Sequence, residues 1–241
     1  MNLEPLQHFH ISIVVPLEVA GIDISISNSV IWMWLADLVI VLFFYIAFRN
    51  PQAVPQRLQA AAELAYLFIR NMVEQNIGPD GRPFIPLLFT LFYFILTCNL
   101  LGLLPGSFTP TSQIVVTGAL AAGVFLFTLI IRFRLYGMGF FRAFAPQGLP
   151  TWLLPLMIPI EVLSFLARPV SLAVRLFANM TAGHTVLGVI AFFGLAMPWF
   201  IAWVPLAFSA VLIAAEVFIA VIQAYIFTIL ACVYMDDALH E

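Results

Sequence analysis

The residues best suited to chemistry in this sequence lie in one of its most apolar regions, between positions 168 and 184. The stretch RPVSLAVRLFANMTAGH holds two arginines, an asparagine and a histidine. A charged side chain at bilayer depth costs at least about 2.5–3.5 kcal/mol on insertion scales. Arg175 cannot easily reach an interface, because about 25 mostly apolar residues precede it back to Pro150 and another long apolar run follows. An arginine held at such depth indicates a functional site.

The polar residues around Arg175 are spaced to act together if this region is a helix. Glu161, Arg168 and Arg175 are seven residues apart and share one face, since seven residues make two turns less about 20°. Asn179 follows Arg175 by one turn, whereas His184 faces away from Arg175. Two structural explanations stay open: Arg168 could simply pair with Glu161, and a lone histidine is usually a satisfied interior residue.

A second long apolar stretch carries Glu216 and Gln223, again seven residues apart on one face. If the chain folds back near Trp199, Gln223 lies level with Arg175. Glu216 then lies within a turn of His184. Amides at such positions could be ordinary interhelical hydrogen-bond partners, but an ionised Glu216 needs a partner that its own helix does not supply. The same register gathers carboxylates at the far end of the hairpin: Glu161, Asp236 and Asp237.

The composition excludes a soluble domain. The 241 residues are 63% hydrophobic and 9% charged, with a mean hydropathy of +1.09, whereas soluble domains are about 45–50% apolar and about 25% charged. The chain is therefore an integral membrane protein. Its net charge of −3 is too small and dispersed for nucleic-acid binding. Cys98 and Cys232 are isolated in apolar runs, so neither a disulfide nor a metal framework is expected.

Long apolar runs predict an all-α integral membrane fold in a single membrane domain, with five membrane-crossing helices and one interfacial amphipathic helix. A crossing needs about 20 residues. The last two runs are longer, so they are either broken or, as we favour, strongly tilted in a hairpin. The predicted segments are an N-terminal segment (1–27), span one (29–48), a surface helix (56–77), span two (84–104), span three (113–134) and the long tilted hairpin (151–197 and 201–235).

Two of these segments carry polar residues that need an explanation. Asp37 interrupts span one, and contact with a neighbouring helix explains it as well as a role in a proton path does. In the segment 56–77, polar residues fall in one narrow arc at 100° per residue, which is typical of a helix lying along the membrane surface: Gln56, Gln59, Glu63, Arg70 and Glu74.

The arginines predict the orientation of the chain in the membrane. Basic residues follow spans one and three, and none lies in the first 27 residues or in the turns near 105–112 and 190–205. Because basic loops stay on the cytoplasmic side, we expect the N-terminus outside and the C-terminus in the cytoplasm.

The chemistry that these residues permit is a proton relay. Histidine and a buried carboxylate can both exchange protons near neutral pH, whereas arginine remains charged. A permanent cation between two half-paths would block direct proton flow and attract a carboxylate arriving from elsewhere. This chain has no obvious mobile carboxylate at the level of Arg175, which implies a partner subunit that supplies one.

Three stretches resemble subunit a of the F-type ATP synthases, in the version found in alphaproteobacteria and mitochondria: NLLGLLPGSFTPTS (99–112), RPVSLAVRLFANMTAGH (168–184) and AEVFIAVIQAYIFTILACVYMDD (215–237). The resemblance implies that Arg175 is the essential arginine facing a ring of c subunits. It assigns Glu161 to the inner proton half-channel, and further candidates for that path are Asp236, Asp237 and Arg168. It assigns four residues to the outer half-channel: Asn179, His184, Glu216 and Gln223.

The resemblance also implies a static, non-catalytic subunit that couples proton flow to ring rotation and ATP synthesis. Nucleotide chemistry would lie on other subunits, and the chain has neither a P-loop GxxxxGK[ST] nor a lysine. Expected partners are the c-subunit ring, peripheral-stalk b subunits, other ATP synthase subunits and membrane lipid. No cofactor, metal or nucleic acid is expected. The expected location is the bacterial cell inner membrane, with the mitochondrial inner membrane as the alternative.

The sequence departs from many bacterial members of that family at three positions. Ala178 stands where many have glycine, and His184 and Glu216 stand where many have glutamate and histidine respectively. One acid and one imidazole survive this exchange, and which of them first accepts the proton stays open. Two rival functions are a secondary transporter, which would favour internal inverted repeats, and a structural membrane anchor whose charges only fix helix register.

Overall fold

The computed structural model describes residues 12–16, 18–19, 22–23, 25–104, 107–137, 154–198, 200–201 and 203–240. Much of the segment predicted at 1–27 lies outside these residues, as does Trp199, the expected centre of the last turn. Before the first helix, β1 (Ile13–Val15) pairs antiparallel with β4 (Ile26–Ser27), and β2 (Glu18–Val19) with β3 (Ile22–Asp23). These strands are rich in isoleucine and valine, whose branched side chains favour extended backbone.

Five helices in the described chain are long and apolar enough to cross a membrane: α1 (Asn28–Phe48), α3 (Ile85–Gly102) with the short helix η2 (Pro79–Phe84) before it, α4 (Ile114–Tyr136), α5 (Leu154–Ala196) and α6 (Trp203–His240). The predicted all-α membrane fold is confirmed. α6 continues past its expected end at 235. Its last turn is stabilised by an i,i+4 contact of 2.7 Å between Asp236 Oδ1 and His240 Nδ1.

The sixth long helix, α2 (Arg57–Asn76), is amphipathic, but its polar face is not wholly exposed. Gln59 is only 7% exposed because its side-chain amide closes the loop before the helix. Its Nε2 donates to Gln52 O, and its Oε1 accepts from Gln52 N, both at 3.0 Å. Arg70 Nε donates to Glu74 Oε1 at 3.1 Å, and Arg82 Nε lies 3.4 Å from the same oxygen. The second of these contacts connects α2 to η2. The surface position of α2 in a bilayer stays a prediction.

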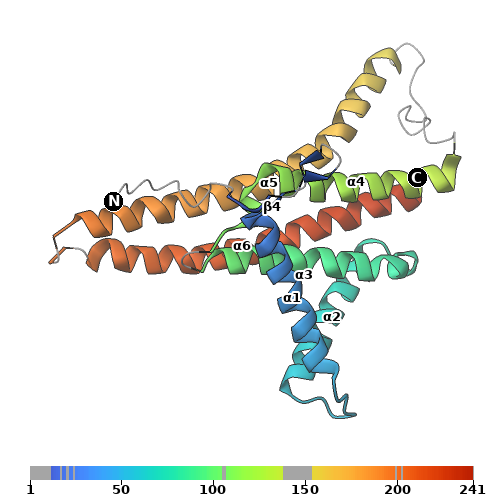
Figure 1. The fold of residues 1–241 in the computed structure, drawn as a ribbon. Helices are drawn as coiled ribbons and strands as arrows, with labels where there is room; N and C mark the ends of the chain where they lie inside the picture. The colour runs from blue at the N-terminus through green and yellow to red at the C-terminus, as the bar shows by residue number, and fades with distance from the viewer. Residues whose placement is uncertain are drawn as a thin grey trace.

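The helices form a crossed arrangement (Figure 1). α3, α4, α6 and the C-terminal part of α5 run roughly alongside one another, and α1 crosses them at a steep angle. The core lies where α3 and α6 meet α2, α4 and α5. Small side chains let helices approach closely in membrane proteins, and α6 buries three of them completely in this core: Ala220, Ala224 and Ala231.

α5 is a helix of 43 residues that changes direction along its length. Its yellow N-terminal part diverges from the other helices, whereas its orange C-terminal part runs antiparallel beside α6 (Figure 1). Pro159 and Pro169 lie inside the helix. An interior proline removes a backbone hydrogen bond and bends a helix. The two longest helices therefore lie together over only part of their length, and their tilt in a bilayer stays a prediction.

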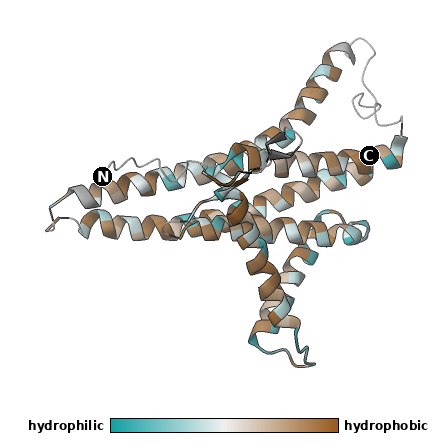
Figure 2. Cartoon of the chain, in the orientation of Figure 1, coloured by the Kyte–Doolittle hydropathy of each residue, from teal (hydrophilic) through white to brown (hydrophobic). Residues whose placement is uncertain are grey.

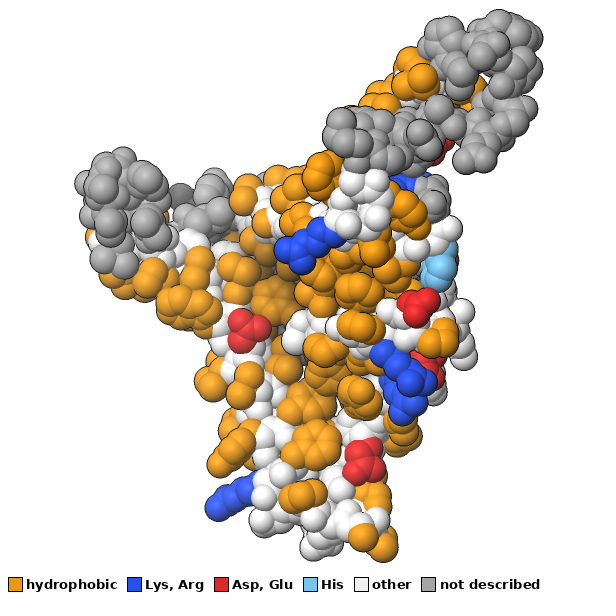
Figure 3. All heavy atoms as spheres, turned by 90° about the vertical axis from the view of Figure 1, so that its right-hand side faces the viewer, with side chains coloured by type: hydrophobic (Ala, Val, Ile, Leu, Met, Phe, Trp, Pro, Cys, Tyr) orange, Lys and Arg blue, Asp and Glu red, His pale blue; other side chains and the backbone are white. Residues whose placement is uncertain are grey.

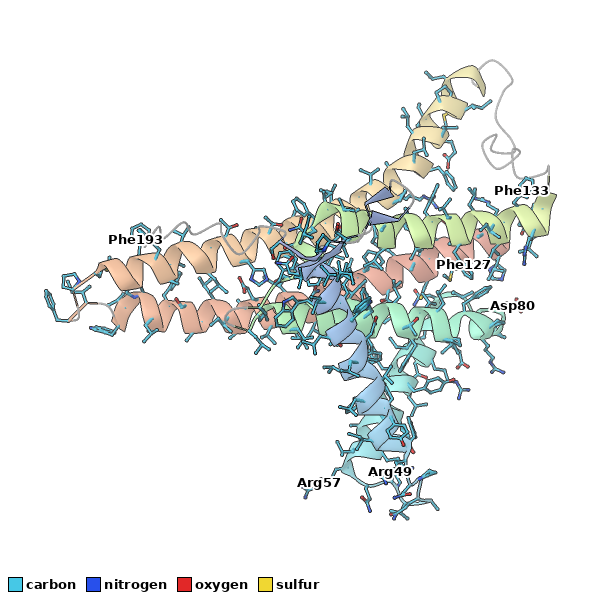
Figure 4. The ribbon with its side chains drawn as sticks, viewed as in Figure 1. Arg49, Arg57, Asp80, Phe127, Phe133 and Phe193 are labelled. Atoms are coloured by element: carbon cyan, nitrogen blue, oxygen red, sulfur yellow. The ribbon has the colours of Figure 1, made fainter. Side chains whose placement is uncertain are left out.

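The outer surface is mostly apolar along the helices. Figure 2 shows hydrophobic residues over most of the helical surface and hydrophilic ones at helix ends and in the loop between α1 and α2. Arg49 and Arg57 lie together at that loop (Figure 4). On the face seen in Figure 3, charged side chains form small separate groups among apolar ones. Such a surface suits lipid contact and gives no broad basic patch on that face.

Candidate functional site

Arg175 lies at the centre of α5, and its side chain is exposed. Small residues flank it on the exposed side of the helix, Ser171 about one turn before it and Ala178 about one turn after it. It makes no hydrogen bond or ion pair with any residue that the structure describes. A cation within an apolar helix needs compensation, and the exposed face leaves Arg175 accessible to a group of opposite charge.

One turn beyond Arg175, Asn179 connects α5 to α6. Its Nδ2 donates to Gln223 Oε1 at 2.7 Å, and Gln223 is only 1% exposed. Gln223 therefore meets Asn179 and does not lie level with Arg175. Gln223 Nε2 is buried and has no partner in the described chain. A buried donor without a partner is costly, so this nitrogen is well placed to bind water.

A cavity of about 250 Å³ opens beside α5 and α6, nearer to the turn that joins them. We call it the turn-side cavity. His184 and Glu216 face it from the two helices, together with Asn179. A Cβ atom on Gly183 would lie 2.6 Å from Glu216 Oε1, so the glycine leaves room for the carboxyl group. Glu216 Oε2 is buried and has no partner among the described residues.

The turn-side cavity combines the groups that proton uptake requires. It is large enough for several water molecules. An imidazole and a carboxyl group share it, and both side-chain types serve as proton donors and acceptors in proteins. The amides of Asn179 and Gln223 continue the polar groups from this cavity toward Arg175.

A second polar group lies near the C-terminus of α6. Arg168 Nη1 donates to Asp237 Oδ2 at 2.6 Å, and the Arg168 guanidinium lies 5.5 Å from the centre of the Tyr234 ring. Arg132 of α4 is 6% exposed and lies within electrostatic reach of Asp237, Arg168 and Glu161. We call Arg132, Arg168, Tyr234 and Asp237 the C-terminal cluster. The cavity beside it measures about 10 Å³, the room of about one water.

Two polar residues have other partners in the structure than the sequence analysis considered. Arg168 pairs with Asp237 of α6 and not with Glu161 on its own helix. Asp236 does not join Asp237, since adjacent residues of a helix point about 100° apart. Asp236 Oδ1 instead contacts His240 Nδ1 at 2.7 Å.

The segment 105–112, predicted as an uncharged polar turn, contains polar residues that the sequence reasoning missed. Its short helix η3 (Pro110–Ser112) is buried. Thr111 Oγ1 donates to Asn99 Oδ1 at 2.7 Å, and both residues are 0% exposed. Thr109 Oγ1 lies 2.9 Å from His184 Nε2. The prolines and the glycine of this segment predict a turn. The one feature of the sequence that could have indicated burial is that none of its residues is charged.

Two other groups stand apart from this site. Arg132 was missed because the orientation rule assigns it to the basic end of span three, although its side chain is buried. Asp37 is exposed on α1, which packs mainly against α3 and α2 and so does not bring it to the paired α5–α6 helices. Within the described ranges, no three His, Cys, Asp or Glu side chains come together to hold a metal ion.

The fold and the polar residues of the site together indicate the class of protein. The described chain has five helices that are apolar enough to cross a membrane. A line of ionisable and amide side chains follows two of them, α5 and α6. This is an integral membrane protein with a polar path suited to ions.

Comparison with known proteins gives the family. The family model of the ATP synthase A chain matches residues 30–236. The ATP synthase subunit a of Magnetococcus marinus is 54% identical over 243 aligned positions, which cover 99% of this chain and 94% of the relative. The chain belongs to the ATP synthase subunit a family. It is a membrane subunit of the proton-translocating sector, it has other ATP synthase subunits as partners, and it is not a catalytic subunit.

Proposed function

We propose that the chain is the static proton-channel subunit of a rotary ATP synthase, with Arg175 facing the c-subunit ring between two proton half-channels. The position of Arg175 carries this proposal. Its side chain is exposed, it has no partner in the described chain, and it lies between the turn-side cavity and the C-terminal cluster along α5. Family membership favours this function over a separate secondary transporter or a structural anchor.

Arg175 needs a partner of opposite charge at bilayer depth, and a carboxylate on the c-subunit ring would supply it. The guanidinium keeps its charge at any physiological pH, so it favours the ionised form of a carboxylate beside it. Ser171 and Ala178 have small side chains, so another helix can approach α5 closely on either side of Arg175. A ring carboxylate would then have to lose its proton before passing Arg175.

The turn-side cavity forms the outer half-channel in this proposal. His184 and Glu216 take protons from water in the cavity. Asn179 and Gln223 continue the path toward the ring, and the unpaired Gln223 Nε2 binds a water molecule there. Protons delivered at this level neutralise a ring carboxylate, which can then move into the apolar membrane.

The C-terminal cluster forms the inner half-channel. Asp237, paired with Arg168, accepts a proton that a ring carboxylate releases after rotation. Glu161 lies on the divergent part of α5, within electrostatic reach of Arg132, and belongs to the same path. Asp236 lies beside His240, at the end of this path. Each charge that crosses 100 mV releases about 2.3 kcal/mol, so several protons must pass for each ATP.

The arginine distribution supports the orientation in the membrane. Arg49 and Arg57 lie together at the loop between α1 and α2 (Figure 4), which the positive-inside rule places on the cytoplasmic side. The α5–α6 turn then faces outward, and the C-terminus lies in the cytoplasm. We assign the chain to the bacterial cell inner membrane, with peripheral-stalk b subunits as further partners beside the c ring.

Replacement of Arg175 tests the proposal. The change Arg175→Ala should abolish ATP-driven proton pumping into inverted membrane vesicles, measured by quenching of a pH-sensitive dye. The assembled complex should still hydrolyse ATP, and its subunit content on a native gel should be unchanged. Val174→Ala, at the exposed neighbouring position, serves as the matched control and should pump normally. Coupled pumping at the parent rate in Arg175→Ala would refute the proposed role.

A further inference from the structure

The segment between α3 and α4 reaches into the site from a different part of the chain. Thr109 is 6% exposed, although it lies in a segment whose prolines and hydroxyl residues predict a surface turn. Its Oγ1 lies 2.9 Å from His184 Nε2. This contact joins positions 75 residues apart in the sequence, and it ties the segment to a residue that lines the turn-side cavity.

Three separate interactions hold Thr109 in place. Ser112 Oγ donates to the Thr109 carbonyl oxygen at 2.7 Å. The neighbouring Thr111 Oγ1 donates to Asn99 Oδ1 at 2.7 Å, deep between α3 and α6. A Cβ atom on Gly102 would lie 2.3 Å from Thr109 Oγ1, so the last residue of α3 must be glycine for the threonine to occupy this position. The hydroxyl is therefore fixed relative to the helices and cannot drift with a loose loop.

A hydroxyl group is an unusual choice of partner for a histidine that must change its protonation state. A carbonyl oxygen accepts only and would bind the protonated nitrogen alone; a backbone N–H donates only and would bind the unprotonated nitrogen alone. A threonine hydroxyl does both, because its hydrogen rotates. Thr109 can donate to His184 Nε2 when that nitrogen is bare, and accept from it when it carries a proton.

We propose that Thr109 is a positioning residue for His184, which keeps the imidazole hydrogen-bonded and in one orientation through both of its protonation states. This inference rests on the proposed function, in which His184 exchanges protons at the turn-side cavity. Among the described residues that line the turn-side cavity with His184, the titratable group is Glu216, which faces the cavity from α6. η3 and the segment before it present only uncharged side chains among the described residues.

The test compares Thr109→Val with Thr109→Ser in the assembled ATP synthase. Valine keeps the branched shape and removes the hydroxyl, whereas serine keeps the hydroxyl and removes the methyl group. Loss of a hydrogen bond to a group that becomes charged should slow ATP-driven pumping at least about threefold in Thr109→Val. The pH profile of pumping should change shape on its acid side. Thr109→Ser should keep the parent profile.

A spectroscopic measurement separates positioning from mere structure. In the purified complex with ¹⁵N-labelled histidine, the ring-nitrogen signals of His184 are identified by their loss in His184→Gln. Thr109→Val should change the Nε2 chemical shift and its pH dependence, while Thr109→Ser should leave both unchanged. Gly102→Ala should have the same effect as Thr109→Val, because the added methyl group must displace Thr109.

The outcomes are distinct. If Thr109→Val keeps the parent rate, pH profile and His184 signal, or if Thr109→Ser is as defective as Thr109→Val, the positioning role is wrong. If His184→Gln itself pumps normally, it is the proposed role of His184 in proton uptake that fails. A His184 signal that still responds to Thr109→Val would in that case show that the hydrogen bond exists without serving transport.

Discussion

The two polar regions on either side of Arg175 differ in how tightly they are packed. The turn-side cavity measures about 250 Å³ and contains a carboxyl oxygen, Glu216 Oε2, without a partner in the described chain. The C-terminal cluster has room for about one water and is closed by the 2.6 Å contact between Arg168 and Asp237. In the proposed function, the first region has room for water beside an unpaired carboxyl oxygen, whereas in the second the carboxylate of Asp237 is already held by Arg168.

In the proposed function, this difference indicates which side requires an ion pair to be separated. An unpaired carboxyl group in an open cavity can change protonation with little rearrangement. An arginine–carboxylate pair that is about one-third exposed must first be separated, and its attraction is screened less than that of a surface pair. We infer that proton uptake on the turn side depends on the identity of single side chains, and release on the opposite side depends on the strength of one ion pair.

The largest expected effect comes from removing Glu216, the one carboxyl group among the described residues that line the turn-side cavity. Glu216→Gln keeps the shape of the side chain but cannot exchange a proton, and such a loss typically costs about 10²-fold or more in rate. ATP-driven pumping in inverted vesicles measures it. Glu216→Asp, which keeps the acid, serves as the control and should retain part of the activity. A Glu216→Gln variant that pumps like the parent would remove the proposed contrast between the regions.

A smaller effect is expected from filling the turn-side cavity beside the same carboxyl group. In Gly183→Ala, the new methyl group would lie 2.6 Å from Glu216 Oε1, so the carboxyl group must move. Because this oxygen is at the end of a flexible side chain, the shift costs about 1 kcal/mol, at the low end for overpacking, which corresponds to about a fivefold loss of pumping if the cost falls on proton uptake. Gly123→Ala is the matched control, because a Cβ there meets nothing within 4 Å. Equal pumping by both variants would mean that space around Glu216 is unimportant.

A single change in the ion pair of the C-terminal cluster should be more harmful than the double change that removes both charges. Asp237→Asn leaves the Arg168 charge half-buried without its partner and should slow pumping a fewfold. The double change with Arg168→Gln should recover part of the loss, with a coupling of about 1 kcal/mol or more. Proton pumping and thermal stability of the purified complex, measured for both single variants and the double variant, give this coupling. Additive losses would show that the 2.6 Å contact does not control this side.

The smallest effect is expected at the Arg70–Glu74 pair of α2, which is about as exposed as the Arg168–Asp237 pair but lies on a different helix from Arg175 and so provides a reference for it. The hydrogen bond from Arg70 lowers the pKa of the Glu74 carboxyl. A carboxyl group whose pKa is lower in the folded state stabilises that state above its unfolded pKa, and the stabilisation is lost as the pH falls through the lower value. Glu74→Gln should therefore remove a small acid-sensitive part of thermal stability, measured between pH 3 and about pH 7, and leave pumping unchanged. A pumping defect would mean that α2 has more than an anchoring role.

The local sequence pattern was sufficient to predict the membrane helices but not the contacts between them. Apolar runs predicted the membrane helices, because lipid demands about 20 apolar residues whatever surrounds them. Counting residues outward from the turn of the hairpin predicted that Glu216 lies close to His184, and both face the same cavity in the structure. It did not bring Gln223 to Asn179 or Arg168 to Asp237. Counting took its register from an assumed turn centre near Trp199, and the observed contacts are offset from that register by several residues.

The sequence by itself determined that this is a membrane protein with a charged residue at depth on a long helix, since composition and periodicity depend only on residue order. Tertiary structure alone decided that Thr109 and Asn99 are buried, that Arg132 joins Arg168 and Asp237, and that Asp236 faces away from them. The physical reason is that a hydroxyl, amide or guanidinium tolerates burial only when distant parts of the chain supply its partners. Those partners lie up to 121 residues away, beyond the reach of any local pattern.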